Sequence, residues 1–245
     1  MCRIPPLVFI HTNGTAEVVP QVGGNLAYYL LHGQNISAFP PGFRMIAGNS
    51  TLRTFHWPIP DIPQSLLSGN LTSQLALQQR ALGFNCLNYN GTPEGSLTRH
   101  FLPSKQFMDT NCADGLRLEL LFPSCWNGID VDSPDHKSHV AYASIVMDDG
   151  TCPEGFEARI PTLFYETIFN TIQFRNTSGK FVLANGDPTG KHSFHGIFST
   201  SRLTTLKVSV TTATSSQDGM STSFKPLSTI AQIWMARSPI ARCLM

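Results

Sequence analysis

Residues 116–122 of the chain read LRLELLF, and this stretch decides the fold class. Leucine alternates with Arg117 and Glu119 over the first five positions, which is the period of two expected of a half-buried β-strand. Similar short runs, separated by turn-forming Gly, Pro and Asn, lie at 7–11, 17–19, 26–31, 43–47, 54–57, 82–87, 138–145, 173–174 and 180–183. Many short strands with few helices predict an all-β fold, a β-sandwich or jelly-roll-like architecture with long loops.

Helix is predicted at only two places, as one or two short elements. Residues 71–82 put Leu71, Leu75 and Leu82 on one face, and 163–171 carry apolar side chains around one or two turns. These helices are too few to change the fold class.

Composition narrows the function classes. Charged residues make up 13% of the 245 residues and the net charge is +1, so neither nucleic acid nor an anionic membrane surface is favoured as a partner. No apolar segment is long enough to predict a membrane span. The chain also lacks the nucleophile elbow, the phosphate-binding loop, the dinucleotide fingerprint and the His-Glu-x-x-His motif.

Two features predict an extracellular protein. The Asn-X-Ser/Thr acceptor pattern for N-glycosylation occurs at Asn13, Asn35, Asn49, Asn70, Asn90 and Asn176. Four of the six cysteines lie in the central region, at Cys86, Cys112, Cys125 and Cys152. An even set without Cys-x-x-Cys favours two disulfides over a zinc site, and the sequence leaves all three pairings open.

The segment 122–142 is the richest in chemical groups. It combines a cysteine, a tryptophan, several carboxylates and two histidines with turn-forming Pro123, Gly128 and Pro134. This composition predicts an irregular loop that enters a short strand, and loops on a rigid scaffold are where binding and catalytic groups concentrate.

Five stretches in order carry a family resemblance, at 38–48, 114–117, 122–142, 150–153 and 185–196. They resemble a fungal secreted family known as DUF1996, a domain of unknown function, over roughly Gly14 to Gly196. The resemblance implies an extracellular, cysteine-paired protein in a cell-wall or plant-polysaccharide context. It implies no particular reaction.

The chain also departs from the family pattern. The family resemblance implies a signal peptide and a histidine-rich segment upstream of Met1, and an aspartate where this chain has Ile197. We therefore expect one β domain at 1–198, truncated at its amino terminus, and a Ser/Thr-rich tail at 199–245 that is non-family sequence and poorly packed. We expect this chain to have little or no activity itself.

The candidate catalytic residues are Asp135, His136, His139, Asp187 and His195. They lie in two turn-rich segments, and we expect them to converge in one concave region. Paired carboxylates would suit glycoside hydrolysis. No cofactor is predicted, although His136 and His139 would hold a divalent metal if Asp135, Asp187 or His195 supplied a third ligand. The alternative is that the histidines and carboxylates only lock their loops by hydrogen bonds.

Two further side chains are candidates for substrate binding. Trp126 offers a broad apolar face for a sugar ring, but beside a cysteine it is more often a core residue. Arg44 could bind a carboxylate or pair with a nearby acid. The sequence thus predicts a secreted protein that acts on polysaccharide as a hydrolase or lyase, or a non-catalytic carbohydrate-binding or wall-structural protein, or an inactive fragment of either.

Overall fold

A computed structural model describes residues 6–49, 55, 57–58, 62 and 66–183, together with the backbone of a strand at 206–209. Within these residues the fold is all-β, with strands in four antiparallel sheets and only two short α-helices, which confirms the predicted fold class. The helices are α1 (Gln74–Arg80) and α2 (Lys105–Asn111). Short 3-10 turns lie at η2 (Gly69–Thr72) and η3 (Thr171–Phe174).

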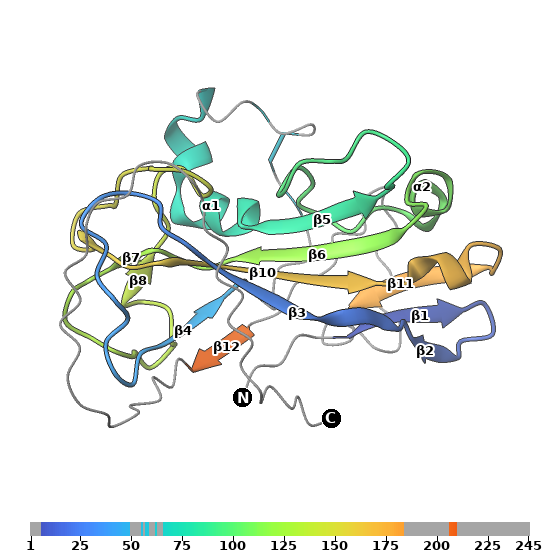
Figure 1. The fold of residues 1–245 in the computed structure, drawn as a ribbon, viewed down its shortest axis with the longest axis horizontal. Helices are drawn as coiled ribbons and strands as arrows, with labels where there is room; N and C mark the ends of the chain where they lie inside the picture. Colours follow the sequence, from blue (N-terminus) through green and yellow to red (C-terminus); the bar gives the residue numbers. More distant parts are fainter. Residues whose placement is uncertain are drawn as a thin grey trace.

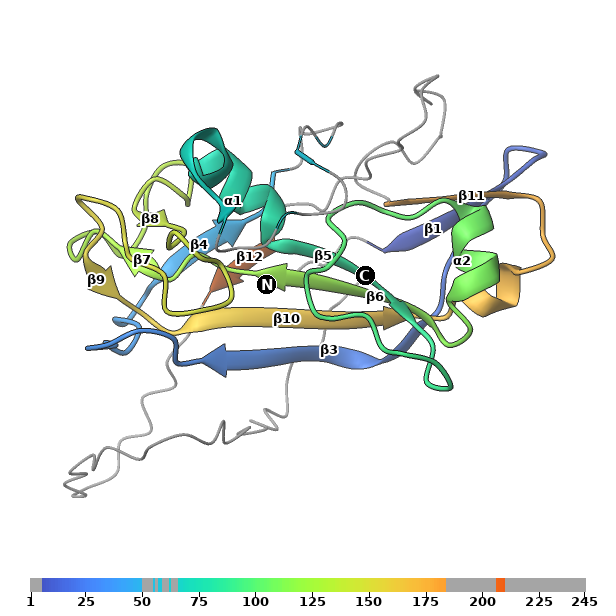
Figure 2. The ribbon, with the colours of Figure 1, turned by 90° about the horizontal axis from the view of Figure 1, so that it is seen from above.

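Two sheets form the body of the molecule. Sheet B has the order β3 (Gln21–Leu30), β10 (Thr162–Phe169), β6 (Gly115–Leu121) and β5 (Leu82–Leu87). Sheet A has the order β11 (Gly179–Leu183), β1 (Leu7–His11) and β2 (Ala16–Val18). Figure 1 shows the four strands of sheet B side by side, and Figure 2 shows β1 and β11 to one side of them.

Two smaller sheets lie at one end of the body. One pairs β4 (Arg44–Ala47) with β12 (Leu206–Ser209). The other has β7 (Cys125–Trp126) between β8 (Val140–Ala141) and β9 (Ala158–Arg159). The strand β12 falls inside the region 199–245 that we expected to be poorly packed, so at least its backbone joins a sheet.

The alternation read from the sequence explains β6. Its leucines at even positions join the main core with Phe9 and Phe181 of sheet A, so the two sheets enclose this core between them. On the opposite face of sheet B, Leu121 and Phe164 join a smaller cluster under α1. Gly115 begins β6 at φ 106°, and a Cβ there would lie 2.5 Å from the carbonyl oxygen of Phe169, so only glycine fits.

That opposite face also carries a buried charge network. The guanidinium of Arg117 lies 2.7 Å from Glu119 and 3.3 Å from Glu166, two carboxylates directly opposite each other on β6 and β10. Tyr28 donates its hydroxyl hydrogen to Glu166 at 3.1 Å, and the Leu97 N–H donates to Glu119 at 2.7 Å. Burial raises the pKa of Glu119, against the opposing effects of the Leu97 N–H and of Arg117.

Several predicted elements agree with the structure and others do not. The strand at 82–87 is found unchanged, and the helix predicted at 71–82 is α1, whose Ser73 caps the N–H of Ala76. The helix predicted at 163–171 is wrong, because those residues form β10 and then η3. The strand predicted at 173–174 is likewise part of η3, and only two residues of 138–145 form a strand. The strand predicted at 54–57 does not lie fully within the described residues.

All four central cysteines are paired, as predicted. Cys86 bonds Cys112 and Cys125 bonds Cys152. The first bond ties β5 to the end of α2, and the second ties β7 to the segment that leads into β9. The sequence had left this choice among three pairings open.

Candidate functional site

The loop at 127–139 connects β7 to β8 and holds most of the predicted site residues. Its first turn is built around Asn127, whose side-chain oxygen accepts the N–H groups of Ile129 and Asp130 at 3.0 Å each. The Trp126 indole N–H donates to the Asp130 carbonyl at 2.6 Å. Side chains of this loop therefore shape its own backbone.

Asp135 serves as the central acceptor of this loop. One carboxylate oxygen accepts the N–H groups of Lys137 and Ser138 and the hydroxyls of Ser133 and Ser138, at 2.9 to 3.0 Å. The backbone N–H groups of Ser138 and Lys137 hold the pKa of Asp135 well below its usual range. The side chain therefore stays ionised at any ordinary pH and is poorly suited to act as a general acid.

His136 bonds to Asp132. Its Nδ1 lies 2.5 Å from Asp132, and its backbone is left-handed at φ 56°. The hydrogen bond from His136 is the largest cause that lowers the pKa of Asp132. The Arg44 guanidinium lies 3.9 Å from the Asp132 carboxylate, and the Arg44 side chain is 60% exposed. Arg44 therefore forms an ion pair with Asp132 at the surface.

His139 is buried, with 1% of its surface exposed. Its ring packs 5.3 Å from that of Phe43, and Nδ1 lies 2.8 Å from the Ser133 hydroxyl. Because Ser133 donates its single hydrogen to Asp135, the contact is satisfied when Nδ1 of His139 carries the proton. Burial lowers the pKa of His139, against the nearby Arg44 backbone and the loop carboxylates, so the ring is neutral near neutral pH.

Trp126 is half-buried and packs against the main core. Its ring meets Phe43 edge-on at 5.9 Å. Its indole N–H is held by the Asp130 carbonyl. Its role in substrate binding remains a proposal.

Asp187 and His195 lie outside the described residues. The convergence of all five candidate catalytic residues therefore stays a prediction. Among the described three, Asp135 and His139 share Ser133 as a hydrogen-bond partner, whereas His136 turns to Asp132.

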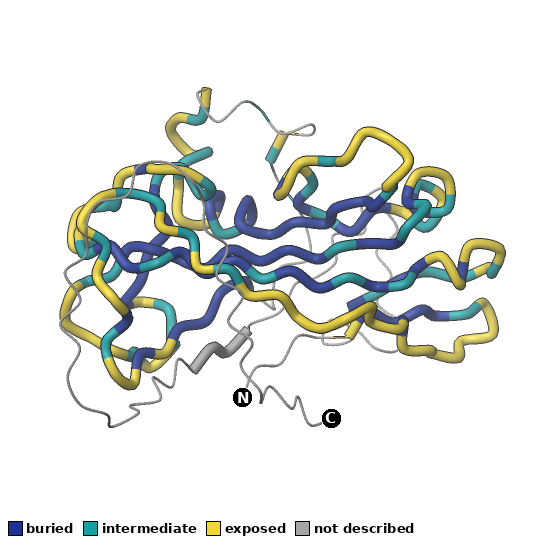
Figure 3. Tube along the Cα trace, viewed as in Figure 1, coloured by how far each residue is buried: buried dark blue, intermediate teal, exposed yellow. Residues whose placement is uncertain are grey.

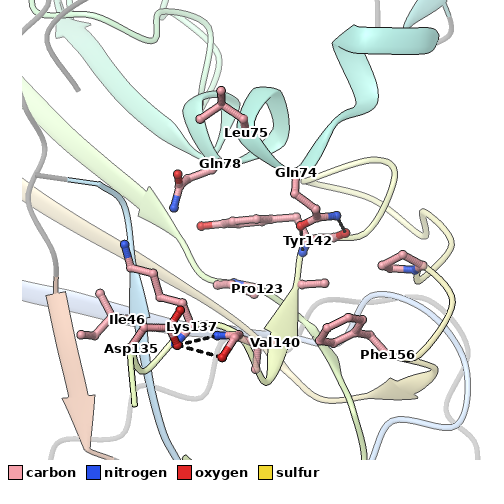
Figure 4. Close-up of a pocket in the computed structure, with 13 residues that line it drawn as sticks. Ile46, Gln74, Leu75, Gln78, Pro123, Asp135, Lys137, Val140, Tyr142 and Phe156 are labelled. Atoms are coloured by element: carbon pink, nitrogen blue, oxygen red, sulfur yellow. Dashed lines mark hydrogen bonds between the residues drawn. The ribbon is translucent and has the colours of Figure 1, made fainter. Parts of the chain in front are cut away.

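A pocket of about 420 Å³ opens between this loop and α1 (Figure 4). Figure 4 shows Gln74, Leu75 and Gln78 of α1 on one side, Lys137 and Asp135 on the other, and Phe156 at one end. Pro123, Val140 and Tyr142 form part of its lining between these walls. Of the three predicted catalytic residues that the structure describes, Asp135 alone lines it.

Polar side chains from the two walls of the pocket bond to the same backbone carbonyl, that of Gly48. Its carbonyl accepts the Lys137 ammonium at 2.7 Å and the Gln78 amide at 3.2 Å. Burial lowers the pKa of Lys137, and Asp135 opposes that shift. Burial also raises the pKa of Tyr142, whose hydroxyl donates to the Leu121 carbonyl at 3.1 Å.

Sequence reasoning missed most of these pocket residues. Gln74 and Gln78 carried one weak signal, since they lie four apart and so share one face of the predicted helix. Lys137 stands between the two predicted histidines but was not singled out. Phe156 follows Gly155 in a loop and gave no periodic signal.

The described residues do contain a group that could hold a metal ion, but at another place. Donor atoms of His32, Asp148 and Asp149 lie within 4.8 Å of one another, and both carboxylates are exposed. The Gly33 N–H already donates to Asp149 at 2.5 Å. Among the residues the structure describes, the histidines of the 127–139 loop belong to no such three-donor group.

The predicted glycosylation acceptors lie at the surface. Asn49 is half-buried, and the remaining five are exposed: Asn13, Asn35, Asn70, Asn90 and Asn176. In the part of the chain that the structure describes, no helix has the length and apolar character needed to cross a membrane.

Comparison with known proteins finds one match. The family model described as "Domain of unknown function (DUF1996)" matches residues 4–201. Neither a curated protein nor a solved structure matches the chain.

Proposed function

The chain belongs to the DUF1996 family, whose description names no activity, so we propose a function from the pocket. We propose that the protein binds a polysaccharide segment between α1 and the 127–139 loop. The observation that carries this proposal is the lining of that pocket, which is mostly apolar and has a few polar side chains on its walls. Amide, ammonium and carboxylate groups face it from the side walls, and the Phe156 ring lies at its end.

Such a lining matches the chemistry of a sugar. Hydroxyl groups both donate and accept hydrogen bonds, and a pyranose ring also has an apolar face that packs on an aromatic side chain. Within the described residues, Lys137 uses one ammonium hydrogen on Gly48, and the four bonds to Asp135 go to one oxygen. Donors and an acceptor therefore remain for a ligand. The volume of about 420 Å³ is in the range of small-molecule sites.

The same geometry favours binding over hydrolysis by the described residues. Asp135 stays ionised and His139 is buried and neutral, so neither supplies the proton that a glycosidase gives to its leaving group. We therefore propose a carbohydrate-binding protein of the cell-wall context, with the loop carboxylates and histidines holding the pocket wall.

A lyase is the second candidate, and Lys137 is the observation that favours it. Burial lowers the pKa of this lysine inside the pocket, and a lysine with a depressed pKa can act as a general base. In that case the chain would release unsaturated uronic-acid products, which absorb ultraviolet light. A substrate panel followed by absorbance separates the two candidates.

The binding proposal is tested with the full chain on a panel of plant and fungal polysaccharides, using affinity gels and then calorimetry on the best ligand. Phe156→Ala should weaken binding by at least about tenfold, because it removes the ring at the end of the pocket. The matched control is Tyr89→Ala, which removes an aromatic side chain that is 71% exposed and does not line the pocket. Equal affinities for the two variants, each with an unchanged melting temperature, would reject the pocket as the binding site.

We also propose that the protein is secreted and N-glycosylated. The two disulfides and the exposed acceptor asparagines support this. After expression in a fungal secretory host, glycosidase treatment should lower the apparent mass on a gel. An unchanged apparent mass would instead favour an intracellular protein.

A further inference from the structure

Among the residues that the structure describes, no strand pairs with the outer edge of β3 in sheet B. The order of that sheet begins with β3 and ends with β5, and the two edges differ sharply in burial. All six residues of β5 are buried, whereas eight of the ten residues of β3 are exposed and the other two are half-buried. Figure 3 shows this contrast between the two edges of the sheet. An open edge offers a row of backbone N–H and C=O groups to another strand.

This edge lacks the charges that usually protect an exposed strand. No Lys, Arg, Asp or Glu occurs from Val18 to Phe43. Large apolar side chains take their place, with Val22 51%, Leu26 44%, Tyr29 53% and Leu31 71% exposed. Protein edges are commonly blunted by lysine, proline or a bulge. The one bulge here shifts the pairing between Thr167 and Ile168, and leaves Asn25–Leu30 in regular register.

We propose that β3 pairs with β3 of a second copy of this chain, so that two four-stranded sheets join into one about a two-fold axis. In an antiparallel pair centred on Tyr28, Leu26 lies opposite Leu30 of the second copy and Ala27 lies opposite Tyr29 of the second copy. Each residue then faces an apolar partner on the same side of the sheet, which is the pairing that stabilises antiparallel strands.

The lack of charge suits a second copy as the occupant. In an antiparallel pair about a two-fold axis, a charge near the middle of the strand lies close to its own copy, so that like charges repel there. β3 has none, while the other exposed edges do: β2 carries Glu17, and β11 carries Lys180. Of these three edge strands, β3 alone can pair with itself without like-charge repulsion.

The pairing is independent of the polysaccharide site. No residue of β3 lines the pocket between α1 and the 127–139 loop. A variant that loses dimer formation should therefore still bind polysaccharide, and a variant that loses polysaccharide binding should still form dimers.

Sedimentation velocity of the purified full chain, from about 1 to about 200 µM, tests the pairing by mass action. We expect a monomer–dimer equilibrium. Leu26→Lys and Tyr29→Lys should each weaken it by at least about tenfold, because they place a charge on the paired edge. Both side chains are exposed, so both variants should keep the melting temperature that the wild type has at concentrations where it is monomeric. The matched control is Val18→Lys, which changes an apolar side chain that is 62% exposed on the neighbouring strand β2.

A wild-type chain that stays monomeric at every concentration would overturn the proposal. So would a dimer that survives both β3 substitutions, or one that the Val18→Lys control weakens equally. Hydrogen exchange gives the remaining outcome. Protection, in a monomer, of the β3 amides that do not bond to β10 would mean that another segment of the same chain covers the edge, which also overturns pairing with a second copy.

Discussion

Removal of the Cys125–Cys152 disulfide should destabilise the protein and loosen the proposed binding pocket. The bond closes a loop with a sequence separation of 27 residues, for which the loop-closure entropy of the unfolded chain gives about 3.5 kcal/mol. We therefore expect Cys125→Ala/Cys152→Ala to lower the free energy of unfolding by about 3.5 kcal/mol, measured by urea denaturation. Pro153 follows Cys152 directly, Phe156 comes soon after it, and both line the pocket. Loss of the bond frees this segment, so hydrogen exchange at 150–158 should also become faster.

The second disulfide supplies the control. Cys86–Cys112 has a separation of 26 residues, so the same relation gives the same loss of about 3.5 kcal/mol. Neither cysteine lines the pocket, and exchange at 150–158 should be unchanged in Cys86→Ala/Cys112→Ala. A loss below about 1 kcal/mol for either pair would refute the unfolded-state reasoning. Equal exchange at 150–158 in both variants would refute the local role of Cys125–Cys152.

Three further substitutions test the interior. Because burial raises the pKa of Glu119, the folded state binds a proton more tightly there than the unfolded state does; this stabilisation is full below the unfolded pKa and is lost as pH rises through the folded pKa. Glu119→Gln should thus flatten the fall in stability as the pH rises above the ordinary glutamate pKa of 4.5, followed by urea denaturation at several pH values, and an unchanged slope would contradict this. Gly83→Ala should cost about 1 to 3 kcal/mol, because a Cβ there would overlap the Glu119 carboxylate; a wild-type melting temperature would count against it. His139→Ala should cost about 2 to 4 kcal/mol, since it removes a buried ring that packs on Phe43, and a neutral result would point instead to a functional histidine.

The predictability of each strand follows from which residue types fill its two faces. β6 alternates in sequence because one face holds leucines and the other holds the Arg117–Glu119 ion pair, so the period of two is visible. β10 is buried on both faces: Leu163 joins the main core and Phe164 the cluster under α1. Its apolar residues form two short runs, Leu163–Tyr165 and Ile168–Phe169, and this pattern cannot be told from a helix by period.

In the candidate site, features that depend on residues close in sequence were predicted, and features that depend on distant segments were not. Asp135 and Pro134 predicted a constrained loop because Asx turns are encoded within a few residues, and the structure has that loop. The facing wall comes from α1, and nothing near Gln74 or Gln78 in sequence indicates that they lie across a pocket from Lys137. The disulfide pairing was open for the same reason, since it depends on which strands become neighbours.

The order of strands in sheet B bears on how the chain folds as it is synthesised. β3 pairs with β10, and the hydrogen bond between Tyr28 and Glu166 spans 138 residues of sequence. β1 likewise pairs with β11, which lies near the other end of the described chain, so this pairing also forms late. By contrast, β5 and β6 are neighbours in both sequence and space, and Cys86–Cys112 lies within that unit. The β5–β6 unit can therefore form and oxidise early, while the apolar β3 has no partner until most of the chain has emerged, a delay that slows folding and favours chaperone contact.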